Sequence, residues 1–156
     1  MLSSSLVAIR IEDYKHSPVH YVVALGDHTT LSRLLSSLPS LANPSQIHTE
    51  LDLLAQERVA DHISSILDRH DVPHLETPLH LNVCLNDSFT TRTLATVSAD
   101  VSLQNASGWN PLQEVVCCRN FEIALTLLHL HHHSAWSKWC RKLPRLVVVL
   151  RRMRDF

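Results

Sequence analysis

The sequence predicts an all-α solenoid built from successive helix–turn–helix repeats. The tetrapeptide TPLH at 77–80 recurs as NPLQ at 110–113, 33 residues later, and a degenerate copy, SPVH, lies at 17–20. A side-chain oxygen followed by proline is typical of a helix start. The oxygen accepts a hydrogen bond from a free backbone amide, and proline has no amide to leave unpaired. Apolar residues spaced by three and four positions follow each copy, which favours helices with one buried side.

A helix start that recurs every 33 residues has the period of ankyrin repeats, and the chain resembles ankyrin repeat proteins. The resemblance implies a stack of helical hairpins with hairpin turns between them, a scaffold that binds proteins through variable surfaces. It also implies that His80 is a structural histidine that links a helix cap to neighbouring backbone groups. The residues that form the motif are Ser17, Pro18, His20, Thr77, Pro78, Leu79, His80, Gly108, Asn110, Pro111 and Leu112.

Length and composition agree with one short array. The chain has 156 residues, of which 45% are hydrophobic and 19% charged, enough to bury a single core. No window reaches the roughly 18 consecutive apolar residues of a membrane-spanning helix. The first residues also lack the pattern of a signal peptide. We therefore expect a cytoplasmic chain, or one at the cytosolic face of endomembranes, in which all four cysteines are free thiols.

The first part of the chain is predicted to hold an N-terminal arm over 1–12 and a degenerate repeat over 13–38. In this repeat, one helix is expected from Pro18 to Leu25 and a second over 29–37. Gly26 suits the end of the first helix because glycine adopts a positive φ without strain. The core-facing stripe of the second helix is predicted to be Leu31, Leu34, Leu35 and Leu38.

The segment 39–73 does not fit the repeat, because the motif starts at 17 and 77 are 60 residues apart rather than 33. It is predicted to be a helical insertion or extended finger. Its helix is expected to begin at the Asn43-Pro44 cap, with Gln46 completing a capping box. Two roles stay open, a helix packed on the concave side or edge of the array and a partner-binding element. The apolar positions assigned to its inner face are Leu51, Leu54, Val59, Ile63, Ile66 and Leu67.

The second repeat is expected over 74–104 and the third over 105–133. The second helix of the former is predicted over 89–97. Ankyrin repeats usually place a small alanine two residues after the histidine, whereas this chain has Val22, Asn82 and Val115. A buried asparagine there needs a hydrogen-bond partner. The hairpin between the two repeats supplies the candidate partner-binding residues Asn105, Ser107 and Trp109.

No metal site, cofactor or catalytic residue is predicted. Cys117 and Cys118 are adjacent, so they point to different sides of a helix. The histidines at 129 and 131–133 lack the glutamate of a His-Glu-x-x-His motif. The sequence also lacks a glycine-rich phosphate loop and a Gly-x-Ser-x-Gly elbow. We therefore expect a protein that is not an enzyme.

Charge is distributed unevenly along the chain. Residues 1–133 hold 7 Lys/Arg against 14 Asp/Glu, a balance of −7, while 134–156 hold 7 against 1, a balance of +6. The latter segment is predicted to form basic helices. Two roles stay open: a cap that docks on the last repeat, or a module in which residues 134–154 bind an anionic membrane surface or an acidic partner. Nucleic acid is not an expected partner. The basic candidate residues are Arg145, Arg151 and Arg152.

A more specific resemblance comes from five segments taken together. QNASGWNPLQE at 104–114, LPRL at 143–146, RRMRDF at 151–156, LAQERVAD at 54–61 and DVP at 71–73 resemble the plant-type branch of the ankyrin-repeat-domain thirteen family. Members of that family continue into a domain that resembles a chaperone for G-protein-coupled receptors, and some animal members act on ubiquitinated membrane cargo. The resemblance therefore implies an adaptor in membrane-protein trafficking or receptor chaperoning, truncated here before the second domain, with a protein partner that the sequence does not identify.

Overall fold

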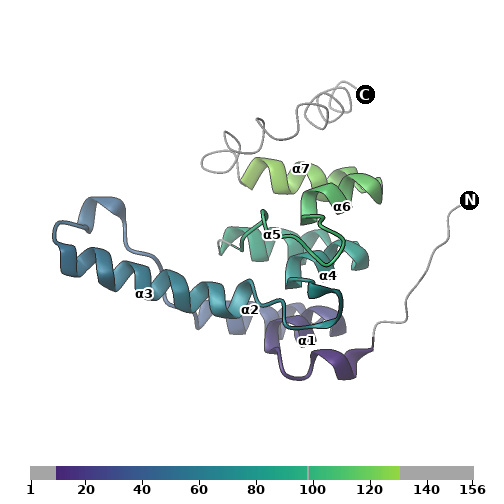
Figure 1. Cartoon of the computed structure of the whole chain (residues 1–156), viewed down its shortest axis with the longest axis horizontal. Helices are drawn as coiled ribbons and strands as arrows, with labels where there is room; N and C mark the ends of the chain where they lie inside the picture. Colours follow the sequence, from purple (N-terminus) through teal and green to yellow (C-terminus); the bar gives the residue numbers. More distant parts are fainter. Residues whose placement is uncertain (1–9, 98, 131–156) are drawn as a thin grey trace, which may run out of the picture.

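Three helical hairpins stacked side by side form the body of the protein (Figure 1). The computed structural model describes residues 10–97 and 99–130, and within these ranges every regular element is a helix. The hairpins pair α1 (Pro18–Leu25) with α2 (His28–Ser36), α4 (Pro78–Leu85) with α5 (Ser88–Thr96), and α6 (Pro111–Cys117) with α7 (Phe121–Leu130).

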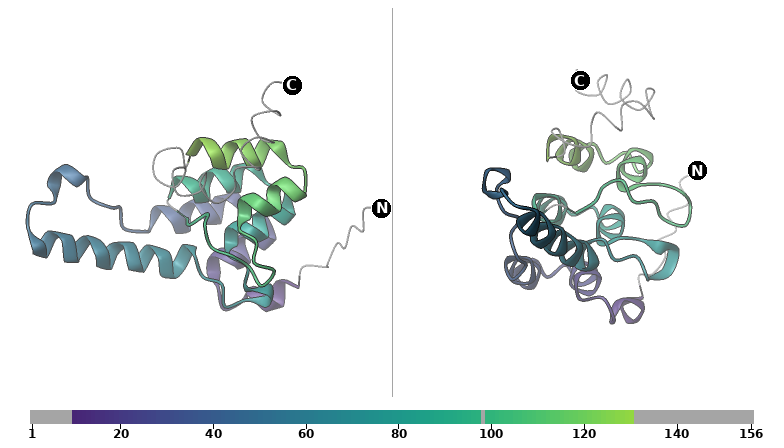
Figure 2. Two further views of the ribbon diagram at one scale, coloured as in Figure 1. Left: turned by 45° about the horizontal axis from the view of Figure 1, so that its top comes forward. Right: turned by 60° about the vertical axis from the view of Figure 1, so that its left-hand side comes forward.

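The hairpins make two layers of helices. In one layer α4 lies between α1 and α6, and in the other α5 lies between α2 and α7 (Figure 2). Pro18, Pro78 and Pro111 each occupy the first turn of a first-layer helix. The predicted all-α ankyrin-type solenoid is therefore confirmed, and so are the three predicted helix starts.

Local capping explains why each hairpin forms where it does. A residue with left-handed backbone follows the first helix within two positions, and the side chain of the next residue accepts hydrogen bonds from the first turn of the second helix. Glycine and asparagine tolerate this backbone, whereas arginine is strained in it. The left-handed residues are Gly26, Asn86 and Arg119, with φ of 68°, 58° and 56°, and the caps that follow are Asp27, Asp87 and Asn120.

These caps also correct two predicted helix starts by one residue. The second helices were expected from residues 29 and 89, but they begin at His28 and Ser88. Asp27 and Asp87 are the N-cap residues, and a helix begins directly after its N-cap.

Two histidines join one repeat to the next. The Ser17 hydroxyl lies 2.7 Å from Nδ1 of His20, whose Nε2 donates to the carbonyl of Glu76 at 2.8 Å. In the same way His80 contacts the Thr77 hydroxyl at 2.8 Å and donates to the carbonyl of Trp109 at 2.8 Å. His80 thus connects the cap of α4 with the backbone that leads into α6.

Within the described residues, the corresponding position of the third repeat makes a local contact instead. Gln113 and Asn110 cap each other instead, at 2.9 and 3.0 Å. The local cap is therefore kept in the third repeat.

Asn82 meets the hydrogen-bond requirement expected of a buried amide. Its side-chain N–H groups donate to the Asp87 carbonyl at 3.0 Å and to the Thr91 hydroxyl at 2.5 Å. These bonds tie α4 to its own partner helix α5. The other end of the amide, Oδ1, is buried without a hydrogen-bond partner.

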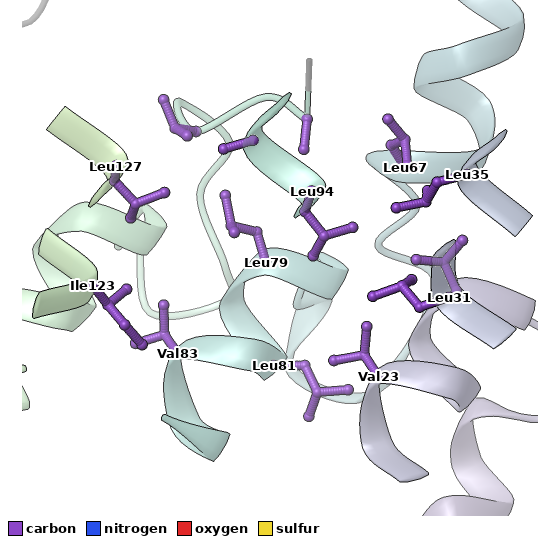
Figure 3. Close-up of a cluster of buried hydrophobic side chains, with 14 of the residues drawn as sticks. Val23, Leu31, Leu35, Leu67, Leu79, Leu81, Val83, Leu94, Ile123 and Leu127 are labelled. Atoms are coloured by element: carbon purple, nitrogen blue, oxygen red, sulfur yellow. The ribbon is translucent and has the colours of Figure 1, made fainter. Parts of the chain in front are cut away.

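One apolar core runs through all three hairpins (Figure 3). Leu94, Val115 and Ile123 are each 0% exposed. The predicted stripe of α2 is confirmed, since Leu31 and Leu35 are buried and Leu34 and Leu38 are partly buried against the core. Further side chains drawn in this cluster are Val23, Leu67, Leu79, Leu81, Val83 and Leu127.

The insertion forms a finger that extends away from the stack (Figures 1 and 2). Its main element is α3 (Glu50–Leu67), and Asn43 caps only the short 3-10 helix η2 (Pro44–Gln46). The long helix begins after Thr49, whose capping box with Asp52 replaces the one expected with Gln46. The predicted start of this helix was therefore wrong, because the backbone at Ile47 is extended and separates the two helices.

Only the base of the finger is buried. Ile63 and Leu67 belong to the core, where Leu67 lies next to Leu35 of α2 (Figure 3). Leu51 and Leu54, which were assigned to the inner face, are exposed. Leu51 and Leu54 therefore do not share the buried side of the helix, because at about 100° per residue Leu54 lies on the opposite side of the helix from Ile63.

Two further 3-10 helices lead into the first and second hairpins, η1 (Ile11–Tyr14) and η3 (Pro73–Leu75). The predicted N-terminal arm is described only from residue 10, and η1 begins within it. The predicted basic segment at 134–156 lies outside the described residues. Among the described helices, none has the length and apolar character needed to cross a membrane.

Candidate protein-binding surface

The loop between the second and third hairpins, residues 105–109, is held in one shape by its own hydrogen bonds. The Asn105 side chain accepts from the backbone N–H groups of Ser107 at 3.0 Å and Trp109 at 3.1 Å. The N–H of Asn105 donates to the carbonyl of Trp109 at 2.8 Å. Gly108 has a φ of 77°, a backbone conformation that favours glycine.

Two neighbouring segments anchor this loop. His80 of α4 donates to the carbonyl of Trp109 at 2.8 Å. The N–H of Ala106 donates to the carbonyl of His74, in η3, at 2.8 Å. The loop is therefore fixed to the second repeat and to the segment that leads into it.

The three predicted loop residues differ in what they offer to a partner. Trp109 is 43% exposed although its backbone is fully engaged. Ser107 is exposed as well, whereas Asn105 is half-buried and uses its side-chain oxygen inside the loop. Trp109 and Ser107 thus present a surface, and Asn105 shapes it. The predicted basic residues Arg145, Arg151 and Arg152 lie outside the described part of the chain.

The finger carries an apolar surface that the sequence analysis did not find. Its exposed leucines are Leu41, Leu51, Leu53 and Leu54, with Leu51 76% exposed. Gln56 exchanges two hydrogen bonds with the backbone of Ala42, which ties the segment before α3 to the helix. The rotation of about 180° between Leu54 and Ile63 is the signal that could have revealed this surface.

The base of the finger is fixed to the second repeat by a carboxylate. Asp68 accepts from the backbone N–H of Asp100 at 2.8 Å and from the Ser64 hydroxyl at 2.8 Å. Burial raises the pKa of Asp68. A shallow groove here is lined by Asp61, Ser64, Ser65, Asp68, Arg69, His70, Asp71 and Leu75.

A second polar cluster lies between the second and third repeats in the first layer of helices. Glu76 precedes α4, Cys84 lies in the last turn of α4, and Glu114 belongs to α6. Each residue offers one possible ligand atom, the Cys84 sulfur or a carboxylate oxygen, and these three atoms all lie within 4.8 Å of one another. The Cys84 thiol donates to Oε1 of Glu114 at 3.7 Å. No spacing pattern along the chain indicates this cluster, because its members come from two repeats.

The electrostatics of this cluster disfavour negative charge. Burial raises the pKa of Glu114, and the Glu76 carboxylate adds to that increase. Burial likewise raises the pKa of Glu76 and raises that of the Cys84 thiol to about 12. At neutral pH Cys84 is therefore a protonated thiol. The residue as a whole stays exposed to solvent, so ions have access to it.

Of the other thiols and histidines considered in the sequence, those in the described part of the chain do not join this group of three ligands, and Cys140 lies outside that part. Cys117 and Cys118 are exposed free cysteines, and Cys118 borders the cluster closely enough for its charge to raise the pKa of Cys84. His129 is exposed near the end of α7. The histidines at 131–133 lie outside the described residues.

Comparison with known proteins identifies similar chains among ankyrin-repeat proteins. Ankyrin repeat domain-containing protein 13B of Mus musculus is 36% identical over 84 residues, which is 54% of this chain and 13% of that protein. Ankyrin repeat domain-containing protein 13C of Homo sapiens is 31% identical over 98 residues, 60% of this chain and 18% of that protein. The chain thus spans less than a fifth of the length of these relatives. No family model and no solved structure matches it.

Proposed function

From the premise that this chain is an ankyrin-repeat protein similar to ankyrin repeat domain-containing proteins 13B and 13C, we propose that it is a non-catalytic adaptor. Ankyrin arrays act as protein-interaction scaffolds. We also propose a class of partner and a place in the cell for this chain. Its partner is a membrane protein or receptor in transit, and the chain works in the cytoplasm, at the cytosolic face of endomembranes. The family resemblance of the sequence supports this assignment.

The exposed Trp109 on its fixed loop is the observation that carries the proposal. Tryptophan contributes large binding energies at protein interfaces, particularly where the surrounding surface is already ordered. Here the backbone on both sides of the side chain is held by Asn105 and His80. A partner that covers Trp109 therefore does not need to order the loop first.

The test compares two exposed aromatic residues. The full chain, Trp109→Ala and Phe121→Ala are used to capture proteins from a cell extract, and bound proteins are quantified by mass spectrometry. Phe121 is the matched control, because it is 40% exposed at the start of α7, away from the loop. We expect membrane proteins or their trafficking factors to be lost with Trp109→Ala and kept with Phe121→Ala. Equal capture by all three chains would refute the assignment of this surface.

A second candidate function rests on the balance of +6 over residues 134–156. In this alternative, the basic segment binds anionic membrane surfaces by electrostatic attraction, which salt weakens. Flotation with phosphatidylserine vesicles tests it. Binding that falls at high salt and in the triple variant Arg145→Glu, Arg151→Glu, Arg152→Glu favours this function. Binding that is absent at low salt excludes it.

A further inference from the structure

The cluster of Glu76, Cys84 and Glu114 contains a buried oxygen whose hydrogen-bonding capacity is unused. Oε2 of Glu114 is inaccessible to solvent and has no hydrogen-bond partner. A buried carboxylate oxygen without a donor is costly, and such groups are normally paired or bound to a cation. The other oxygen of the same carboxylate contacts only the weak Cys84 thiol donor, at 3.7 Å.

The groups around the Glu114 carboxylate do not supply a positive charge that would balance its negative charge. The groups that act on Glu114 are the Glu76 carboxylate and the Cys84 thiol. Those that act on Cys84 are Glu114, Glu76 and Cys118, all of which carry negative charge when ionised. His74 is the group that favours ionisation of Glu76. A divalent cation would supply the missing positive charge and the missing partner of Oε2 together.

We propose that Glu76, Cys84 and Glu114 bind a zinc ion that links the second and third repeats. One sulfur and two carboxylate ligands suit Zn²⁺, which accepts both donor types, whereas Mg²⁺ and Ca²⁺ take oxygen ligands. Zn–S and Zn–O bonds of about 2.3 and 2.1 Å at a tetrahedral angle place the two donor atoms about 3.6 Å apart. The Cys84 sulfur and Oε1 of Glu114 are 3.7 Å apart, so an ion bound by both oxygens of the Glu114 carboxylate would contact Oε1 and also give Oε2 a partner.

Binding requires no oxidant or reductant. The Cys84 thiol releases its proton to solvent, and its sulfur forms a bond to Zn²⁺ in place of one water ligand of the ion. Carboxylate oxygens of Glu76 and Glu114 replace two more waters. Because three protein ligands leave the fourth tetrahedral position open, that position holds a water.

The consequence for the fold is a cross-link between neighbouring repeats. Glu76 and Cys84 belong to the second repeat and Glu114 to the third, so the ion joins α4 to α6. A ligand that binds only the folded state raises the melting temperature in a concentration-dependent way. Zinc would therefore stabilise the stack at the junction that also positions the 105–109 loop.

The test uses Co²⁺ as a spectroscopic substitute for Zn²⁺ with the reduced, metal-free full chain. A Co²⁺–thiolate charge-transfer absorption reports the sulfur ligand, and the histidines near the end of α7 do not produce it. We expect this absorption in the wild type and its disappearance on addition of Zn²⁺. We also expect it in Cys117→Ser, the matched control, which removes an exposed thiol outside the three ligands.

Two ligand variants complete the experiment, each checked for folding by circular dichroism. Cys84→Ser should lose the absorption, and Glu114→Gln should weaken Zn²⁺ binding by at least about tenfold. Zn²⁺ should also raise the melting temperature of the wild type more than that of Glu114→Gln. The proposal is overturned if the folded wild type shows no Co²⁺–thiolate absorption. It is equally overturned if Cys84→Ser retains the absorption, or if Glu114→Gln binds Zn²⁺ as tightly as the wild type.

Discussion

The repeat stack and the finger place the same type of side chain in opposite environments. Leu94 of α5 is 0% exposed, because helices on both sides cover it, whereas Leu51 of α3 is 76% exposed. Both helices have well-formed N-terminal caps. The difference shows that capping determines where a helix begins, while neighbouring helices determine whether its apolar side is buried.

The largest difference between the two regions is expected when a leucine is truncated in each of them. Leu94→Ala should lower the free energy of unfolding by about 3 kcal/mol, because it leaves a cavity in a closed core. Leu54→Ala on the finger should lower it by less than about 0.5 kcal/mol. Urea denaturation measures both. Similar losses in the two variants would mean that the finger leucines are buried in solution.

Acidification should weaken the stack through its buried histidine bridges. Burial lowers the pKa of His20 to about 4 in the folded protein, compared with about 6.5 when unfolded. Between these values the unfolded chain binds a proton that the folded chain does not, so stability is complete above pH 6.5 and falls as the pH approaches 4. The contribution is on the order of 3 kcal/mol. Thermal denaturation across this pH range measures it.

His20→Gln, which copies Gln113 of the third repeat, should remove this part of the pH dependence. His129→Gln is the control, because it changes an exposed histidine. A wild-type slope that persists in His20→Gln would show that the bridge is not its source.

A smaller effect should come from the left-handed residue that ends α6. Arg119 has a φ of 56° at the position that glycine occupies in the first repeat. Arg119→Gly should therefore stabilise the protein by about 1 kcal/mol, since glycine carries no Cβ penalty there. Arg119→Ala keeps the Cβ and should give no such gain. The melting temperatures of the two variants measure this difference, and an equal gain in both would contradict the prediction.

The smallest global effect should follow from uncapping the finger. Thr49→Ala removes the side-chain oxygen that accepts from the Asp52 N–H at 3.1 Å, a local loss of about 1 kcal/mol. Hydrogen exchange should become faster in the first turn of α3, while global unfolding in urea changes little. A matching loss of global stability would indicate that the finger and the stack unfold as one unit.

Much of the stack was predictable from the chain, because its signals are local and periodic. Thr77 and Asn110 mark helix starts by their capping side chains, and the leucine spacing of α2 marks its buried side. Ser17 also stands at a helix start, but the expected side-chain cap is absent there, because its hydroxyl contacts His20 instead. The role of His80 was implied by the resemblance to ankyrin repeats. Its ring reaches from one cap to the next, a distance set by the repeat.

The finger and the candidate metal cluster were less accessible to prediction. Asn43-Pro44 and Thr49 are both good helix starts, and only the extended backbone at Ile47 shows which one opens α3. Glu76 and Glu114 are 38 positions apart in the sequence, so no spacing rule pairs them. Their proximity depends on how closely α4 and α6 pack.

The sequence by itself determined the number and order of the hairpins, their caps and the leucines that face inward along α2. Each of these depends on side chains acting within about one helical turn, where backbone geometry fixes the distances. The tertiary structure decided which leucines of α3 are covered, that Trp109 is presented on a fixed loop, and that two carboxylates meet a thiol. These features depend on contacts between repeats, and only the packed stack sets those distances.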